Sequence, residues 1–193
     1  ALFMAVSEVE LIKSTISPEE CSVEALPGLL AIFGGSLSSV QEITSGTAPK
    51  SFRDMYVQWL DKNDPKIRSM VLMPENYEDW NNFNVYSDLL LFEADLGYIT
   101  SAIVIFLEAP GSIAELGAFS QIESLKDRLV IVVIDDRHPK KSFISLGPLR
   151  QLEEKDKDSV CVIPAIHPTE LLNDIDVVNA AIHKKMAGSK TKR

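Results

Sequence analysis

The sequence predicts an α/β fold: a Rossmann-like, doubly wound parallel sheet of about five strands with helices on both faces. Two observations predict it. Short continuous runs of Val, Ile, Leu and Phe recur along the chain, and such runs are typical of parallel strands that are buried on both faces. Helix-forming segments alternate with these runs, which favours β–α–β units over an antiparallel sheet. The predicted strands are residues 29–33, 67–73, 103–107, 129–134 and 160–163.

The first predicted strand, residues 29–33, is followed directly by three small residues, Gly34, Gly35 and Ser36. Small residues at the end of a strand let a ligand approach the backbone, which makes this loop a candidate substrate contact. A simple tight turn has the same composition. The segment before the strand, residues 1–28, is predicted to be helical and to pack on the domain or on a partner.

A helix and the second strand are predicted next. Residues 51–62 place apolar side chains on one side at helical spacing, and Pro65 follows the break in this pattern. Glu75 lies just after the second strand, residues 67–73, where it is either a pocket residue or a solvated loop carboxylate. The acidic and aromatic stretch 77–84 is either a lid over a base or, as aromatic side chains favour, part of the core packing.

Residues 86–98 are predicted to form a helix that carries two acidic residues, Asp88 and Glu93. Charged residues on a helix usually face the solvent, so periodicity alone gives neither of them a role.

The clearest chemical signal follows the third predicted strand, residues 103–107. A turn with Pro and Gly111 comes next, and Ser112 is the predicted N-cap of a helix over 113–125. Glu115 then lies one turn into this helix. The spacing of Ser112 and Glu115 is also that of a capping box, in which Glu115 only binds the N–H of Ser112.

A helix that starts directly after a strand presents free N–H groups and a partial positive charge at the carboxyl edge of the sheet. A ribose or phosphate can bind there, oriented by the N–H groups of Gly111 and Ser112. The carboxylate of Glu115 would face the same opening, where it can attack the C1′ atom of a sugar or stabilise an oxocarbenium-like transition state.

The last segments of the chain are rich in basic residues. Residues 137–141 and Ser142 follow the fourth strand, and they form either a phosphate-binding loop or a solvated basic loop. A final helix is predicted over 175–186, and residues 184–193 are predicted to be a disordered basic tail. The main domain would therefore span residues 29–183.

Composition narrows the class of protein. The chain has 193 residues, 46% of them hydrophobic, which is enough for one domain with a sizeable core. The net charge of −9 argues against nucleic-acid binding by the whole surface. Cys21 and Cys161 give no disulfide framework and indicate a reducing, cytoplasmic location. No apolar run reaches the length of a membrane span, and no signal peptide or metal-ligand motif is evident, so we expect no membrane association, metal or cofactor.

The run Pro110 to Phe119 resembles the Glu-Leu-Gly-Ala motif of the nucleoside 2-deoxyribosyltransferase family, in which the Glu that corresponds to Glu115 attacks the sugar. The resemblance is closer to the deoxyribosyltransferase-like effectors of bacterial retrons, which share a Glu-x-Pro-Gly-Ser-x-x-Glu-Leu-Gly-Ala-Phe-Ser run. Three further matches support it: Gly34-Gly35, Met73-Pro74-Glu75 and Lys140 to Arg150, with Lys141 in place of Arg.

This resemblance implies an enzyme that cleaves the N-glycosidic bond of NAD or a related nucleotide or nucleoside. Glu115 would be the catalytic residue. Asp88 and Glu93 lie near the position where the transferases carry an acidic residue facing the sugar, and Glu108 lies near a second one, at a different spacing. The implied substrate contacts are Gly34, Gly35, Ser36, Glu75, Asp88, Glu93, Glu108, Gly111, Ser112 and Ser142.

The resemblance also implies partners and an oligomeric state. Retron effectors are anti-phage toxins restrained by a reverse transcriptase with its msDNA and RNA, and the transferases are homo-oligomers. Larger effectors carry a C-terminal nucleic-acid-binding domain, whereas this sequence ends at Arg193, so we expect a partner to provide any such function. Two alternatives stay open: a nucleotide sensor of the same fold without catalysis, and a true nucleoside deoxyribosyltransferase.

Overall fold

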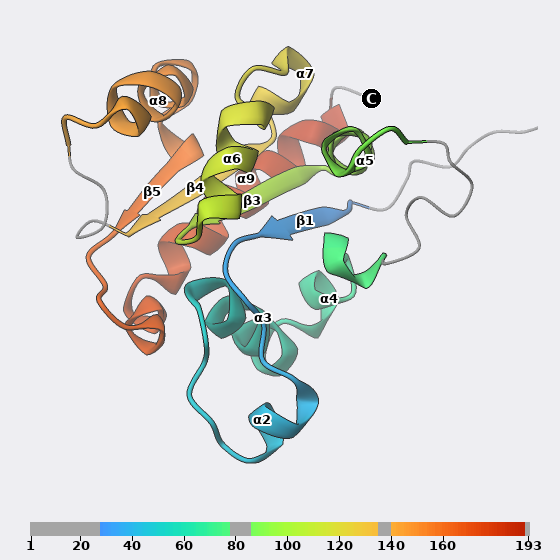
Figure 1. Ribbon diagram of the computed structural model, residues 1–193, viewed down its shortest axis with the longest axis vertical. Helices are drawn as coiled ribbons and strands as arrows, with labels where there is room; N and C mark the ends of the chain where they lie inside the picture. The colour runs from blue at the N-terminus through green and yellow to red at the C-terminus, as the bar shows by residue number, and fades with distance from the viewer. Residues whose placement is uncertain (1–27, 78–85, 135–139, 192–193) are drawn as a thin grey trace, which may run out of the picture.

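Five parallel strands form a single sheet in the computed structural model, which describes residues 28–77, 86–134 and 140–191 (Figure 1). The strand order is β2-β1-β3-β4-β5, and every neighbouring pair is parallel. This confirms the predicted doubly wound α/β class. The strands are β1 (Leu30–Phe33), β2 (Val71–Leu72), β3 (Ala102–Leu107), β4 (Leu129–Ile134) and β5 (Val160–Ile163).

Helices cover both faces of this sheet (Figure 1). One face is packed by α3 and α9, and the other by α6, α7 and α8, with α5 beside α6. The α-helices are α2 (Val40–Thr44), α3 (Phe52–Asn63), α4 (Pro65–Arg68), α5 (Leu89–Ile99), α6 (Pro110–Phe119), α7 (Glu123–Lys126), α8 (Arg150–Lys155) and α9 (Ile175–Thr191). Shorter helical turns are η1 (Pro74–Asn76), η3 (Ser145–Leu149), η4 (Lys157–Ser159) and η5 (Pro168–Asn173).

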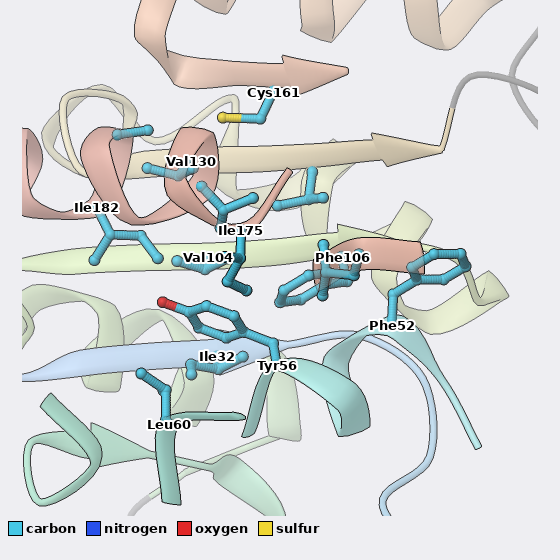
Figure 2. Packing of buried hydrophobic residues seen from close by; sticks show 14 of the residues in the cluster. Ile32, Phe52, Tyr56, Leu60, Val104, Phe106, Val130, Cys161, Ile175 and Ile182 are labelled. Atoms are coloured by element: carbon cyan, nitrogen blue, oxygen red, sulfur yellow. The ribbon is translucent and has the colours of Figure 1, made fainter. Parts of the chain in front are cut away.

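The strand side chains divide into two core layers because they alternate between the faces of the sheet. Figure 2 shows the layer under α3 and α9, where Tyr56 lies between the strand residues Ile32 and Val104 and the α9 residue Ile182. The Tyr56 hydroxyl donates to Oδ1 of Asn179 at 2.9 Å, so this buried polar group is satisfied. The opposite layer packs Phe33 edge-on against Phe119.

The topology creates a crevice between β1 and β3. After β1 the chain moves outward to β2, and it then returns to place β3 on the other side of β1. The helices that follow β1 and β3, namely α3 and α6, therefore lie on opposite faces of the sheet. In open α/β sheets, ligands bind at such a switch point, at the carboxyl ends of the strands.

The second predicted strand, residues 67–73, is wrong over most of its length. Only Val71–Leu72 is a strand, and residues 65–68 form α4. The cause is local: the Asp64 side chain accepts the N–H of Ile67 at 3.0 Å, and Pro65 occupies the first helical position. Such a cap starts a helix despite the apolar residues that follow.

The helix predicted over 113–125 is also wrong in its bounds, because α6 begins at Pro110, ends at Phe119 and is followed by the separate α7. Ser112 is not the N-cap. Its hydroxyl lies inside the first turn and accepts the N–H groups of Ala109 and Glu108 at 3.1 and 3.2 Å. Ala109 occupies the N-cap position instead.

The predicted tail over 184–193 is wrong in part, because α9 continues to Thr191. Lys184 and the buried Lys185 bind Asp156, and Lys184 also binds Asp158. The predicted N-terminal helix and Cys21 lie outside the described residues. Within the described ranges, none of the helices has the length and apolarity that crossing a bilayer requires.

Candidate functional site

A cavity of about 420 Å³ opens at the switch point of the sheet. This volume suits a small organic ligand of nucleoside size. The wall is built from the end of β1, the first turn of α3, η1, α5 and α6, so it joins five elements that are distant in the sequence. The lining residues are Phe33, Gly34, Arg53, Pro74, Glu75, Tyr77, Leu89, Glu93 and Glu115.

Glu115 lies in this cavity, as its position in the sequence predicts. Its Oε2 atom is buried and has no hydrogen-bond partner among the described residues. The pKa of Glu115 is raised to about 7, mainly by burial and in addition by the charges of Glu93 and Glu75, while Arg53 opposes the shift. The capping-box alternative is wrong, because Ala109 holds the N-cap position and Ser112, not Glu115, occupies N3. The carboxyl group is thus left for a ligand.

Glu93 reaches the same cavity from α5. The pKa of Glu93 is raised to about 7, mainly by burial and in addition by the nearby charge of Glu75. Asp88, its neighbour one turn earlier, does not line the cavity. The Asp88 carboxylate caps α5 by accepting the N–H of Leu91 at 3.0 Å. Asp88 therefore fixes the start of the helix that carries Glu93.

Glu75 and Arg53 form an ion pair in the cavity wall. The Arg53 side chain is only 4% exposed, whereas that of Glu75 is 52% exposed. A second guanidinium nitrogen of Arg53 donates to the carbonyl of Ile32 at 3.4 Å. Glu75 is thus a cavity residue, as predicted. Its ion-pair partner, Arg53, was not among the predicted site residues.

The sequence does contain a signal that Arg53 forms an ion pair. Arg53 shares one face of α3 with Tyr56, Val57 and Leu60, which lie three, four and seven positions further on and are all buried. A buried cation on the apolar face of a helix needs a counter-charge within reach, so this pattern points to an ion pair.

Glu108 does not line the cavity, contrary to its predicted role as a substrate contact. Its carboxylate is turned beneath the loop after β1, where it accepts three backbone N–H groups. Oε1 binds Gly35 and Arg53, both at 3.0 Å, and Oε2 binds Phe52 at 2.7 Å. Glu108 therefore neutralises the amino end of α3 and joins it to the end of β3.

The two glycines after β1 are required by close packing. A Cβ atom on Gly34, whose φ is +152°, would lie 2.9 Å from the Cβ of Phe106. One on Gly35 would lie 2.6 Å from the Cβ of Ser51. The carbonyl of Ser36 accepts the Ser51 hydroxyl at 2.9 Å. Of the three predicted loop contacts, only Gly34 lines the cavity, while Gly35 and Ser36 hold the loop in place.

Replacing Gly35 with Ala is expected to lower the free energy of unfolding by about 1–3 kcal/mol, because the new methyl group overpacks the contact with Ser51. Urea denaturation measures this change. Gly117→Ala is the matched control, since a Cβ there meets no atom within 4 Å. An unchanged midpoint for Gly35→Ala would show that the loop moves away from α3 at little cost.

The remaining predicted contacts lie near the cavity or away from it. Gly111 is exposed in the first turn of α6 and Ser112 is buried there, and neither lines the cavity. The Ser142 hydroxyl is hydrogen-bonded to Ser145 at 3.0 Å, at the start of the segment leading to α8. Of the predicted aromatic stretch only Tyr77 is described; it lines the cavity and contacts Phe92 edge-on. Residues 78–84 lie outside the described ranges.

Metal chemistry gains no support from the residue types in the described part of the chain. No group of three or more His, Cys, Asp and Glu side chains there is arranged to hold a metal ion. Cys161 is a buried free thiol, and burial raises its pKa to about 11. This thiol is therefore a poor nucleophile at neutral pH.

The known proteins that this chain resembles in sequence are retron proteins. The sequence model of a family described as "STM3845 retron effector protein" matches residues 49–193, well over half of the chain. The chain is 35% identical over 103 residues to the "Retron Ec86 putative ribosyltransferase/DNA-binding protein" of Escherichia coli, which is 52% of this chain and 34% of that protein. It is 38% identical over 72 residues to the corresponding Retron Ec73 protein of the same species, 37% of this chain and 23% of that protein. The aligned region thus spans about a third or less of each relative.

Proposed function

Because the chain belongs to the STM3845 retron effector protein family, we propose that it is a retron-associated defence effector that cleaves the N-glycosidic bond of NAD or a related nucleotide or nucleoside. The fold of the described residues and the word ribosyltransferase in the names of two relatives support a reaction at a ribose. The observation that carries the proposal is the Glu115 carboxyl group, half-buried beside Glu93 in the cavity at the switch point.

Two carboxyl groups with pKa values of about 7 share one small space. Like charges so close resist double ionisation, so near neutral pH the pair holds about one proton. One group then acts as an ionised nucleophile and the other as a protonated acid. This division of roles is what cleavage of a glycosidic bond requires.

In the proposed reaction, an oxygen of Glu115 bonds to C1′ of the ribose as the bond from C1′ to the base nitrogen breaks. The electron pair of that bond goes to the base, and Glu93 donates a proton when the base leaves as an anion. A water molecule then attacks C1′ as the bond from C1′ to Glu115 breaks. The proton of this water goes to Glu93 where Glu93 has given its own proton to the base, and to the solvent where the base has left as a neutral molecule. If a second base attacks instead of water, the outcome is transfer.

The charge of the cavity favours a cationic leaving group. Arg53 and Glu75 neutralise one another, so the cavity carries about one negative charge from the Glu93–Glu115 pair at neutral pH. A pyridinium ring, as in NAD, is attracted to such a site, whereas a phosphate is repelled and would extend outward. This supports NAD over a nucleotide that places its phosphates in the cavity.

We also propose a partner, an oligomeric state and a location for the enzyme. A reverse transcriptase with its msDNA and RNA would hold the protein inactive, the chain would form a homo-oligomer, and the site of action would be the cytoplasm. Membership of a retron effector family supports the first of these. The relatives' names mention DNA binding, and we propose that a partner or a region beyond the aligned one provides it.

The test is a substrate panel analysed by chromatography. The purified chain is incubated with NAD, ribonucleosides and deoxynucleosides, each with and without a second free base. We expect wild type to release nicotinamide or a free base and Glu115→Gln to release none. Glu154→Gln is the matched control, because this exposed carboxylate pairs with Arg150 in α8.

Each outcome discriminates between functions. Product that appears only when a second base is present would identify a transferase. Binding of the substrate by wild type without any product would identify a nucleotide sensor and overturn the proposed enzyme. Equal release by wild type and Glu115→Gln would remove Glu115 from the reaction.

A further inference from the structure

Gly111 lies in the first turn of α6, one helical turn before Glu115, and neither its backbone nor its packing requires a glycine. Its φ is not positive, so other residues can adopt the same backbone conformation. The position is exposed, and a Cβ atom built there would come no closer than 4.0 Å to its neighbours, which is ordinary van der Waals contact. Because glycine weakens a helix relative to alanine, the missing side chain calls for another explanation.

The atom that a Cβ on Gly111 would meet at 4.0 Å is Oε1 of Glu115. Side chains of a helix lean toward its amino end, so the Glu115 carboxyl group extends over the preceding turn, where Gly111 lies. A side chain at position 111 would lean the same way and would stand directly in front of Oε1. Gly111 therefore leaves open the space that the tip of Glu115 faces.

The two carboxyl oxygens of Glu115 have different surroundings. Oε2 is buried in the protein and has no hydrogen-bond partner among the described residues, so a ligand atom reaches it only if the wall moves. Oε1 lies beside the exposed Gly111. Glu115 lines the cavity and Gly111 does not, so the space over Gly111 is on the outer side of the carboxyl group. Oε1 is thus the oxygen that a ligand can approach.

This arrangement orients a nucleoside in the site. The apolar part of the cavity wall is formed by Phe33, Pro74, Tyr77 and Leu89, which suits the flat ring of a base. A base bound there would place C1′ beside Oε1, because base and sugar are joined by a single bond. The sugar ring would then lie at the open side of the cavity, over Gly111.

We propose that Gly111 determines access to the nucleophile: its missing side chain provides the space in which a sugar meets Glu115, and Oε1 is the oxygen that bonds to C1′ as the base leaves. The inference rests on the proposed function, since it assumes attack by Glu115 on a sugar. This role differs from the predicted one, in which the N–H of Gly111 orients the ligand. A side chain at position 111 should exclude the sugar and leave α6 intact.

The first experiment compares Gly111→Ala and Gly111→Val with the same changes at Gly117, an exposed position of α6 where a Cβ meets no atom within 4 Å. Alanine at either position should raise the urea midpoint, because alanine is the better helix former. Single-turnover release of the base at saturating substrate should fall about 10-fold in Gly111→Ala and about 100-fold in Gly111→Val, because C1′ is held away from Oε1. Both Gly117 variants should release the base at the wild-type rate. A purely structural role of Gly111 would not combine higher stability with lower activity.

The second experiment measures access to Glu115 without any substrate. A water-soluble carbodiimide with glycine ethyl ester converts accessible carboxyl groups to amides, and mass spectrometry of peptides gives the rate of labelling of Glu115 relative to the exposed Glu153. We expect Gly111→Val to lower this relative rate severalfold, because its side chain covers Oε1. Gly117→Val should leave the rate unchanged.

Labelling of Glu115 that Gly111→Val leaves unchanged, or that Gly117→Val lowers equally, would overturn the inference. Release of the base at the wild-type rate by Gly111→Val would do the same, because the sugar would then reach Glu115 from another side. If Gly111→Val is unfolded by circular dichroism, the same comparisons between Gly111→Ala and Gly117→Ala decide the matter. A wild-type chain that cleaves nothing would remove the proposed function, whereas the labelling rates would still show whether Gly111 controls access to Glu115.

Discussion

Glu115→Gln is expected to lower the rate of glycosidic cleavage by about four orders of magnitude, the largest effect of any single change in the site. The amide has nearly the same shape but no charge to attack C1′, and loss of a nucleophile typically has effects of this size. Single-turnover release of the base, measured at saturating substrate, tests this directly. Glu115→Asp should retain the charge but withdraw it by one methylene, with a loss of about 100-fold.

Glu115→Gln should also change the pH dependence of the free energy of unfolding, and this effect does not depend on any substrate. The pKa of Glu115 is about 7 in the folded chain and near 4.5 in the unfolded chain. Between these values the folded state binds more protons, so the free energy of unfolding falls as pH rises from about 4.5 to about 7. Glu115→Gln removes this loss. It should be more stable than wild type by roughly 2 kcal/mol at pH 8, after allowance for partial solvent exposure, and nearly equal to it at pH 4.

Urea denaturation at the two pH values measures this difference. Glu154→Gln, an exposed change of the same kind, should show none. A Glu115→Gln chain that is less stable than wild type at pH 8 would mean that the carboxylate has a favourable partner in the folded state. In that case Glu115 would not be free to act as a nucleophile.

The position of Glu115 was predictable because it depends on local order: a buried strand, a tight turn and a helix that starts at the sheet edge. The same local reasoning failed for Glu108. Its place at a strand end predicts a cavity residue, but its partners are 55 to 73 positions away in the sequence. Where a side chain turns at such a point depends on which other element arrives there, and sequence spacing does not contain that information.

For Arg53 the helix was predicted, but the role of the side chain was not. Its helix was predicted from apolar periodicity, and the charged residue on the apolar face was left unexplained. Its meaning depends on Glu75 arriving from η1 and Glu115 from α6, three segments brought together only by the strand order. The raised pKa values of Glu93 and Glu115 have the same origin, because burial and repulsion by neighbouring carboxylates belong to the assembled cavity. Elements were thus readable from the sequence, while the charge balance of the site was not.

Glu93→Gln is expected to separate substrates by the charge of their leaving group. A neutral nucleoside releases its base as an anion unless a proton is supplied, so loss of the acid should slow release about 10²- to 10³-fold. The nicotinamide of NAD leaves as a neutral molecule and needs no proton. Its release in a single turnover should therefore remain within a few-fold of wild type.

The pH profiles provide the second half of this prediction. In wild type, the rate for a neutral nucleoside should be bell-shaped with a narrow maximum near pH 7, because the Glu93–Glu115 pair must hold one proton. The single-turnover rate for NAD should instead rise through about pH 7 and stay high, because only ionisation of Glu115 is required. Glu93→Gln should abolish the alkaline decline for the nucleoside and move the NAD profile to lower pH, since a neighbouring negative charge is removed.

Stopped-flow release of nicotinamide and of a purine base, followed from pH 5 to pH 9 in wild type and Glu93→Gln, makes the comparison. Glu153→Gln, an exposed carboxylate of α8, is the matched control and should leave both profiles unchanged. An equal loss for both substrates would indicate that Glu93 holds the ribose and donates no proton. A bell-shaped NAD profile would instead place a proton requirement in the attack on C1′, which a neutral leaving group does not explain.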